Sequence, residues 1–210
     1  LSVSSAASDV YKRQPERFSM SAQFVARVLS YCLGKGTLGL RGRRQRPWLE
    51  IIRSETEKLY QNQQLRGLKD SHPGQLDYFW DTLPTDGFYD KNRLRVRSDE
   101  LYRAYELMYP RDKKVITPQI ISIVGMPGVS ALWSDKGRVV GRLGKLVTGW
   151  THEENEYLAE WINNQGYDCR AVRKLGVQFT RDSTKPMIDA LRPFTHKCIR
   201  FKFKKIPPRL

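Results

Sequence analysis

The sequence predicts an α+β fold in which the order helix, hairpin, helix, hairpin, helix occurs twice. Three observations lead to this prediction. Segments with apolar residues at helical spacing alternate with short segments of β-type alternation. Glycine and proline residues separate these segments. The same order of segments returns after about a hundred residues, which indicates an internal repeat.

The composition is typical of a folded, strongly basic protein. The 210 residues are 40% hydrophobic, enough to bury a core in one domain or in two halves that share one. The 37 Lys and Arg exceed the 22 Asp and Glu, and this charge of +15 favours nucleic acid as partner over an anionic membrane. No apolar run approaches the ~20 residues that cross a bilayer, so we expect a soluble protein without a membrane partner. The cysteines have no metal or disulfide spacing and indicate thiols in a reducing compartment: Cys32, Cys169 and Cys198.

The elements of the first half follow from local patterns. They are a helix over 24–33, strands at 37–40 and 48–52 around a basic loop, a solvated helix or insertion at 55–70, a helix over 76–83, a turn at 87–90, a strand over 93–97 and a helix from 98 to 110. Gly34-Lys35-Gly36 ends the first helix. Strict alternation in the last strand places three arginines on one face. Ser98 is a suitable N-cap for the helix from 98 to 110, and Pro110 ends that helix.

The second half repeats this order. We expect a helix from 126 to 137, strands at 138–143 and 145–150, a helix over 155–164, a hairpin over 167–180 and a helix ending at 191. Pro127 suits the first turn of a helix. Thr151 and Glu154 have the spacing of a capping box. Asp182 or Ser183 can cap the last helix.

Three stretches resemble the LAGLIDADG homing endonuclease family in its two-motif, single-chain form. Leu33 to Leu38 is similar to the glycine-acid-glycine turn that ends the family's first motif helix, and 97–116 is similar to its link between halves. The third stretch runs from Met126 through Asp135-Lys136-Gly137 to Asn155, and continues at Arg192-Pro193-Phe194 and Lys202. Together these stretches cover about residues 20–203 in the family's order.

The resemblance implies two αββαββα halves, with the two motif helices packed together and a saddle-shaped antiparallel sheet over a duplex. We therefore divide the chain into an N-terminal extension (1–19), a first half (20–110), a second half (111–196) and a basic tail (197–210). The extension suits a transit segment, a cleaved propeptide or a translated cloning adapter equally well. Small residues at helical spacing would let the motif helices approach closely, or are ordinary core residues: Ala26, Ser30, Gly34, Gly128 and Ala131.

The resemblance also implies what chemistry is missing. Family hydrolysis uses an acidic residue from each motif helix to hold divalent ions, which need anionic oxygen ligands. Lys35 and Lys136 occupy these two positions, so we expect no catalytic residue, no metal, no cofactor and no enzyme activity. Asp135 is one residue away, and a shift of one residue turns a helical side chain by about 100°, which we expect to point it away from its partner. The remaining candidates lie far apart and read as surface or capping residues: His72, His152 and His196.

The cations therefore predict a nucleic-acid-binding surface. We assign to it Lys35, Arg41, Arg43, Arg44, Arg46, Arg93, Arg95, Arg97, Lys136, Arg138, Arg142, Lys145, Arg170, Arg173, Lys174, Lys202, Lys204 and Lys205. Any one of them is also compatible with a solvated surface charge. In the tail, Phe201 and Phe203 could stack on unpaired bases. A final strand or an extended anchor is the other interpretation of this aromatic segment.

The most concrete functional hypothesis is a non-catalytic RNA-binding protein derived from a homing endonuclease. We expect a structural subunit of a mitochondrial ribosome, or of a chloroplast one, that binds rRNA and neighbouring proteins of a ribonucleoprotein particle and has no small-molecule substrate. The alternatives are an intron splicing or maturation factor and a site-specific DNA endonuclease with displaced metal ligands. A sequence-specific DNA-binding regulator is an intermediate case.

Overall fold

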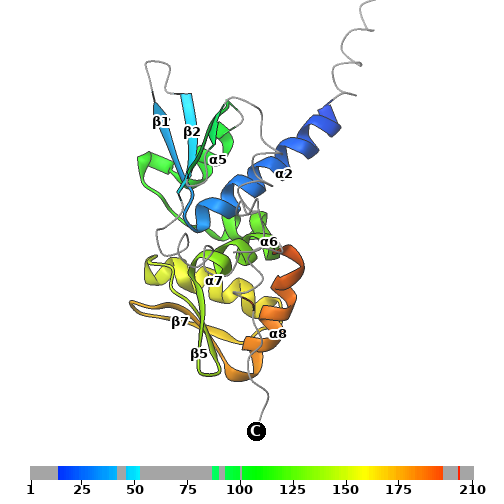
Figure 1. Cartoon of the computed structure of the whole chain (residues 1–210), viewed down its shortest axis with the longest axis vertical. Coiled ribbons are helices and arrows are strands. Elements are labelled where there is room, and N and C mark those ends of the chain that lie inside the picture. The colour runs from blue at the N-terminus through cyan, green and yellow to red at the C-terminus, as the bar shows by residue number, and fades with distance from the viewer. Residues whose placement is uncertain are drawn as a thin grey trace, which may run out of the picture.

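The computed structural model describes residues 14–41, 46–52, 87–89, 93–99, 101–195 and 203. Each half of the chain contributes one four-stranded antiparallel sheet. Figure 1 shows the two halves one above the other, with helices α2 and α6 side by side between them. Within the described ranges, no helix combines the length and apolarity that crossing a membrane requires.

The first half contains the predicted hairpin strands and the helix that follows them, but Gly87–Tyr89, predicted as part of a turn, form a strand. Its elements are α2 (Gln14–Leu33), β1 (Thr37–Arg41), β2 (Arg46–Ile52), β3 (Gly87–Tyr89), β4 (Arg93–Arg97), α5 (Leu101–Met108) and the short 3-10 helix η1 (Pro110–Asp112). Helix α2 starts ten residues before the expected Phe24, inside the segment that we assigned to the N-terminal extension. The predictions for 55–70 and 76–83 fall outside the described residues.

The second half supplies the remaining elements. They are α6 (Pro118–Lys136), β5 (Gly137–Val140), β6 (Leu143–Leu146), α7 (His152–Asn164), β7 (Cys169–Val172), β8 (Gly176–Phe179), α8 (Arg181–Leu191) and the 3-10 helix η2 (Arg192–Phe194). The strand predicted over 138–143 is wrong at its end, because the chain turns at Gly141 with a φ of 60°. The strand predicted to reach Trp150 ends at Leu146, and the Thr148 hydroxyl then bonds to the Trp150 amide and to Asn155.

The two sheets share one topology. Their strand orders are β1-β2-β4-β3 and β5-β6-β8-β7, so each half joins two hairpins through its second and fourth strands in sequence. Leu38 pairs with Leu49 in the first sheet, and Leu146 pairs with Val177 in the second, and all four side chains are buried. Because side chains alternate along a strand, the residues directly before and after these four point to the opposite face of each sheet, away from the helices.

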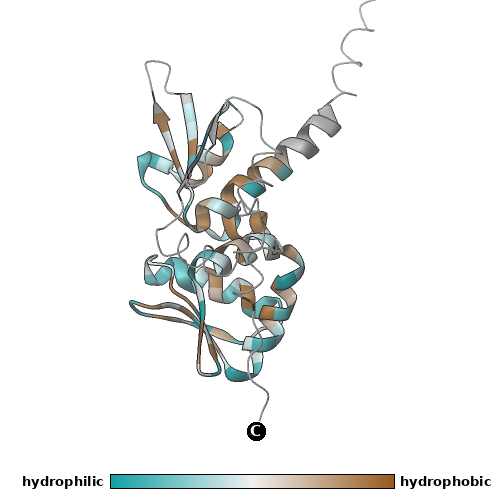
Figure 2. Ribbon diagram, viewed as in Figure 1, coloured by the Kyte–Doolittle hydropathy of each residue, from teal (hydrophilic) through white to brown (hydrophobic). Residues whose placement is uncertain are grey.

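Helices α2 and α6 pack closely at the centre of the molecule. Gly128 lies against the other helix, since a Cβ added there would be 3.1 Å from Ser30 Oγ. Gly125, with φ 55° and ψ −155°, kinks α6, and the segment that carries Pro127 begins directly after it, as the sequence predicted. Figure 2 shows hydrophobic residues concentrated on these two helices. The close approach predicted from the small residues is therefore confirmed.

Side-chain caps connect the second half to the linker before it. Thr151 and Glu154 form the predicted capping box at the start of α7. The second carboxylate oxygen of Glu154 accepts the Ile116 amide at 2.8 Å, which joins α7 to the chain that leads into α6. Helix α8 is capped by Thr180, whose side chain accepts from the Ser183 amide, and not by Asp182 or Ser183 as predicted.

The described part of the C-terminal tail is an anchor. Phe203 is 1% exposed and belongs to the common core. The Arg192 guanidinium donates to its carbonyl oxygen at 3.1 Å. Of the two interpretations of this aromatic segment, base stacking is therefore wrong for Phe203, because its ring is enclosed by protein; Phe201 lies outside the described residues.

Candidate nucleic-acid interface

Two lysines, Lys35 and Lys136, lie at the C-terminal ends of the two central helices. Lys35 follows α2 in a turn that the Gly34 and Gly36 amides close on the Tyr31 carbonyl oxygen. Lys136 is the last residue of α6. Both side chains are half-buried. The two positions belong to one junction, because the Lys35 amide donates to the carboxylate of Asp135 at 3.0 Å.

Asp135 corrects one prediction from helical geometry. Its carboxylate does not point away from the other helix, because the space beside Gly34 admits it. A Cβ at Gly34 would be 2.0 Å from Asp135 Oδ2. The side chain of Asp135 reaches α2 because that helix ends in a glycine turn, whose backbone leaves room for a carboxylate one residue before Lys136.

A third lysine, which the sequence did not single out, reaches the same junction. Lys114 of the linker donates through Nζ to the Cys32 carbonyl oxygen in the last turn of α2. Burial lowers the pKa of Lys114, and the nearby charge of Lys136 lowers it further, whereas Glu154 acts in the opposite direction. The junction is therefore a place where positive charge is concentrated and partly removed from water.

The chemistry of this junction favours anions. Ammonium groups bind phosphate oxygens and supply no ligand to a divalent ion. Within the described ranges, His, Cys, Asp and Glu side chains form no group of three or more that could hold a metal. At the start of α7, His152 Nε2 lies 3.4 Å from Glu156 Oε1. The other two histidines, His72 and His196, fall outside the described residues.

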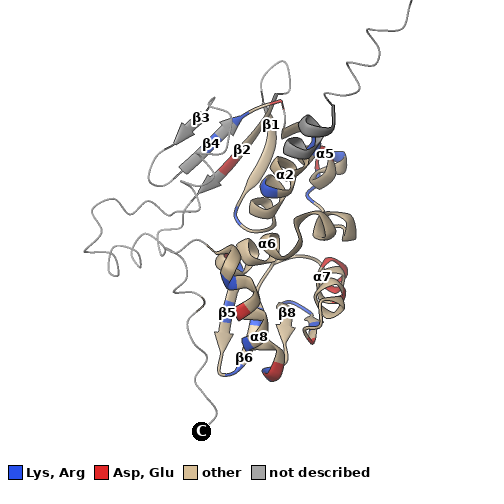
Figure 3. Cartoon of the chain, turned by 90° about the vertical axis from the view of Figure 1, so that its right-hand side faces the viewer, with Lys and Arg blue, Asp and Glu red and all other residues tan. Residues whose placement is uncertain are grey.

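The outward face of the second sheet carries a row of cations. The register places four residues in line across the strands β5, β6, β8 and β7: Arg138, Lys145, Gln178 and Arg170. Arg138 and Arg170 are exposed and Lys145 is half-buried, and we call these four residues the second-sheet row. Figure 3 shows basic residues on β5 and β6, and acidic residues on α7, which lies beside β8 in that view. The predicted residues Arg142, Arg173 and Lys174 are exposed in the two hairpin turns of the same sheet.

The equivalent row on the first sheet has a different chemistry. It consists of Thr37, Glu50, Arg95 and Phe88, and we call it the first-sheet row. Arg95 donates to one oxygen of Glu50 through Nε at 2.9 Å and also through a terminal nitrogen, so its charge is compensated. Its guanidinium carbon lies 5.5 Å from the ring centroid of Trp48. Arg97 is exposed on the same face.

The other predicted cations are located only by backbone or lie outside the described residues. Arg41 and Arg46 pair at the ends of β1 and β2, and Arg93 begins β4. Five predicted residues fall outside the described ranges: Arg43, Arg44, Lys202, Lys204 and Lys205. Sequence reasoning missed Trp48, Glu50 and Gln178, because cross-strand neighbours depend on a register that a single strand does not reveal.

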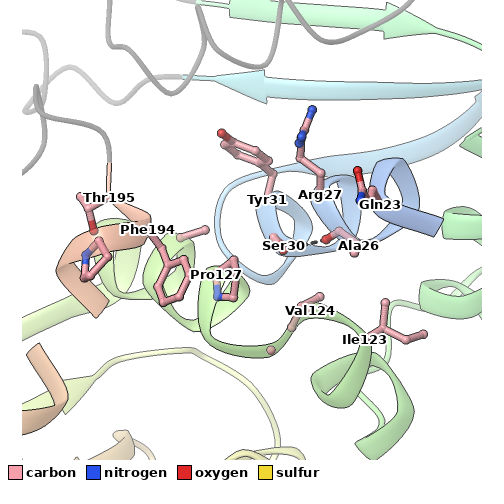
Figure 4. Close-up of a pocket in the computed structure, with 13 residues that line it drawn as sticks. Gln23, Ala26, Arg27, Ser30, Tyr31, Ile123, Val124, Pro127, Phe194 and Thr195 are labelled. Atoms are coloured by element: carbon pink, nitrogen blue, oxygen red, sulfur yellow. Dashed lines mark hydrogen bonds between the residues drawn. The ribbon is translucent and has the colours of Figure 1, made fainter. Parts of the chain in front are cut away.

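A pocket of about 710 Å³ opens between α2, α6 and η2 (Figure 4). Its wall includes Tyr31, Val124, Pro127 and Phe194, and none of the described residues that line it is His, Cys, Asp or Glu. Ser30 donates to the Ala26 carbonyl oxygen at 2.6 Å beside it. The pocket is lined mainly by apolar side chains together with Tyr31 and Arg27. The candidate site is formed instead by the two sheet rows and by the lysine junction, which consists of Lys35, Lys114 and Lys136.

Comparison with known proteins gave one class of match. No protein family and no individually curated protein matches the sequence. Among solved structures, the homing endonuclease I-WcaI bound to its DNA recognition sequence is similar over 97% of this chain and 95% of that chain, with a TM-score of 0.64 and 13% sequence identity. The chain has the fold of a homing endonuclease. The predicted α+β, LAGLIDADG-like architecture is therefore confirmed as a fold, at low sequence identity.

In this fold the lysine junction and the two sheet rows are neighbours. The lysine junction closes the two central helices, and each sheet extends from it, because β1 and β5 begin directly after Gly36 and at Gly137. The outward rows of both sheets therefore start next to the same charged point. A long anion could contact the junction and either row at once.

Proposed function

We propose that this chain is a non-catalytic RNA-binding protein with a homing endonuclease fold, and that it serves as a structural subunit of an organellar ribosome, most concretely a mitochondrial one. The observation that carries the proposal is the lysine junction. Lys35 lies in the turn after α2 and Lys136 ends α6, at the places where the family resemblance calls for carboxylates. Lys114 adds a further ammonium. Such a junction attracts phosphate and repels the divalent ions of hydrolysis.

Charge distribution supports a polyanion as the partner. The chain has a formal charge of +15, and the second-sheet row presents three cations on one face. Neutralising phosphates with Lys and Arg releases counterions, which stabilises binding of any nucleic acid. The charge and the outward cations therefore support a nucleic acid as the partner, and the comparison of RNA with DNA in the tests below decides between the two.

The first test removes the junction charges. The double variant Lys35→Ala/Lys136→Ala is compared with the unsubstituted protein in binding to rRNA fragments and to duplex DNA of equal length, over a range of salt. Loss of two phosphate contacts should flatten the plot of log affinity against log salt by about 1.4–1.8. Lys185→Ala is the matched control, since Lys185 is exposed on α8 and pairs with Asp189. An unchanged slope for the double variant would show that the lysines do not contact phosphate.

The second test addresses the particle. The protein should sediment with ribosomes in an extract of organelles and leave them at high salt. Recovery with free intron RNA alone would point to the splicing or maturation alternative and reject the ribosomal version. Preference for duplex DNA over RNA at physiological salt would reject both and favour a DNA-binding regulator.

Asp135 supports a second candidate function, a site-specific DNA endonuclease with displaced ligands. Its carboxylate lies at the junction of the two helix ends, in contact with the Lys35 amide. This candidate requires Mg²⁺-dependent cleavage of a duplex that Asp135→Asn abolishes. The absence of cleavage across a target library at millimolar Mg²⁺ would exclude it.

A further inference from the structure

The two outward rows are structurally equivalent but chemically unequal. Thr37 is the first residue after Gly36, and Arg138 is the first after Gly137, so both rows begin at the same point of their halves. Each then crosses four strands in the same order. The second-sheet row carries three cations and no carboxylate, whereas the first-sheet row carries one cation and one carboxylate that bond to each other.

The second-sheet row suits a ribose-phosphate backbone. Strands lie about 4.8 Å apart, so a row across four strands spans about 14 Å. Arg138 and Arg170 stand on the two edge strands, with Lys145 between them. The two exposed guanidinium groups and the half-buried ammonium of Lys145 can contact successive phosphates of one helical segment.

The first-sheet row offers flat surfaces, and its one cation, Arg95, is paired with Glu50. The Trp48 ring lies over the backbone of Gly39, where an added Cβ would be 2.8 Å from two ring carbons. The Arg95 guanidinium carbon lies 5.5 Å from the centroid of that ring, and Glu50 accepts a hydrogen bond from Arg95 Nε. Side chains of Arg95 and Glu50 are 31% and 14% exposed, and Trp48 is half-buried. Indole and guanidinium planes are the surfaces on which unpaired bases stack.

We propose that the two sheets hold one RNA in different ways: the second sheet binds the phosphates of a helical segment, and the pair Trp48–Arg95 on the first sheet stacks an unpaired base next to that segment. The ligand is thus an RNA in which a helix adjoins unpaired bases. This inference rests on the proposed RNA-binding function. It adds the class of RNA and states which part of that RNA contacts each sheet.

The experiment uses three RNA probes: a hairpin with an unpaired loop, the same stem as a blunt duplex, and the loop sequence as a single strand. The full chain should bind the hairpin most tightly. Trp48→Leu should weaken hairpin binding by about 5- to 150-fold, the range for losing one stacked base, and leave blunt-duplex binding and the salt slope unchanged. Arg95→Lys, which keeps the charge and removes the plane, should act in the same direction.

The second-sheet row is tested on the same probes. Arg138→Gln/Lys145→Gln/Arg170→Gln should weaken binding of stem and hairpin alike and flatten the salt slope by about 2 to 2.7. The single variants Arg138→Gln and Arg170→Gln alter exposed side chains, and each should flatten the slope by about 0.7 to 0.9, which keeps the test decisive when the triple variant does not fold.

Three results would overturn the inference. They are an equal loss of duplex and hairpin binding in Trp48→Leu, a salt slope that Trp48→Leu flattens as much as the cation variants do, and a salt slope that the cation variants leave unchanged. Failure of the unsubstituted chain to bind any of the three probes would instead reject RNA binding itself. The two failures are therefore distinguishable from one set of titrations.

Discussion

Replacing Gly34 with alanine should disturb the contact between the ends of the two central helices. The new Cβ would lie 2.0 Å from Asp135 Oδ2 and 2.9 Å from Asp135 Cγ, far inside the contact distance of about 3.5 Å. Asp135 is short, so its carboxylate must rotate away. The hydrogen bond from the Lys35 amide, 3.0 Å long, is then lost.

The size of the effect follows from two opposing terms. A hydrogen bond to a charged group contributes about 1.5–3 kcal/mol. Replacing glycine by alanine restricts the unfolded chain and returns about 0.4–1 kcal/mol. The free energy of unfolding should therefore fall by about 1–2 kcal/mol in Gly34→Ala. For a chain of this length, that lowers Tm by about 2–8 °C.

A double-mutant cycle tests the cause. Unfolding in urea is measured for Gly34→Ala, Asp135→Ala and the two together. Because Asp135→Ala already removes the carboxylate, Gly34→Ala should cost at least about 1 kcal/mol less in that background. Gly166→Ala is the control, since Gly166 has φ 87° and open space around it, and its cost of about 1 kcal/mol should add to that of Asp135→Ala. Additivity of Gly34→Ala and Asp135→Ala within about 0.5 kcal/mol would refute the reasoning.

Three further outcomes are expected. The pKa of Lys114 is lowered in the folded state, so the unfolded chain binds more protons between that lowered pKa and 10.5. In this pH range the free energy of unfolding of the unsubstituted protein should rise with pH relative to that of Lys114→Met, as urea unfolding at several pH values would show. Parallel pH profiles of the two proteins would contradict this expectation. Burial raises the pKa of Cys32 to about 12, so native protein should alkylate at Cys32 far more slowly than urea-unfolded protein, as mass spectrometry of the modified peptide would show; equal rates would mean that the thiol is accessible. Glu154→Ala removes acceptors from the Thr151 and Ile116 amides and should lower the free energy of unfolding by about 2 kcal/mol, more than Thr151→Ala at about 1; the reverse order would contradict the link to Ile116.

Features that depend on local chemistry could be predicted from the sequence. The end of α2 at the Gly34 turn, the strand Arg93–Arg97 and the capping box at Thr151 required neighbouring residues alone. The repeated order of elements predicted the fold class, because both halves form a four-stranded sheet with the same strand order. The same patterns placed Lys35 and Lys136 at equivalent ends.

Turns and caps that compete with strand propensity were harder to predict. The run 138–143 has the composition of a strand, yet Gly141 takes a left-handed conformation and starts a hairpin turn inside it. Thr180 caps α8 in place of the two predicted residues: its amide donates to the Asp168 carbonyl oxygen, and the Ser183 hydroxyl accepts the Asp168 amide at 2.8 Å, so the start of the helix is tied to the segment before β7. In both cases tertiary pairing chose among local alternatives of similar energy.

The sequence by itself determined the charge, the repeated order of elements and the presence of Lys35 and Lys136, since these are properties of residue identity and order. The tertiary structure alone decided which residues face one another. It brought Asp135 to the Lys35 amide across a hundred positions of sequence, placed Lys114 at the end of α2, and paired Arg95 with Glu50. Strand register and helix crossing fix such contacts, and both depend on the burial of the whole core and not on any one segment.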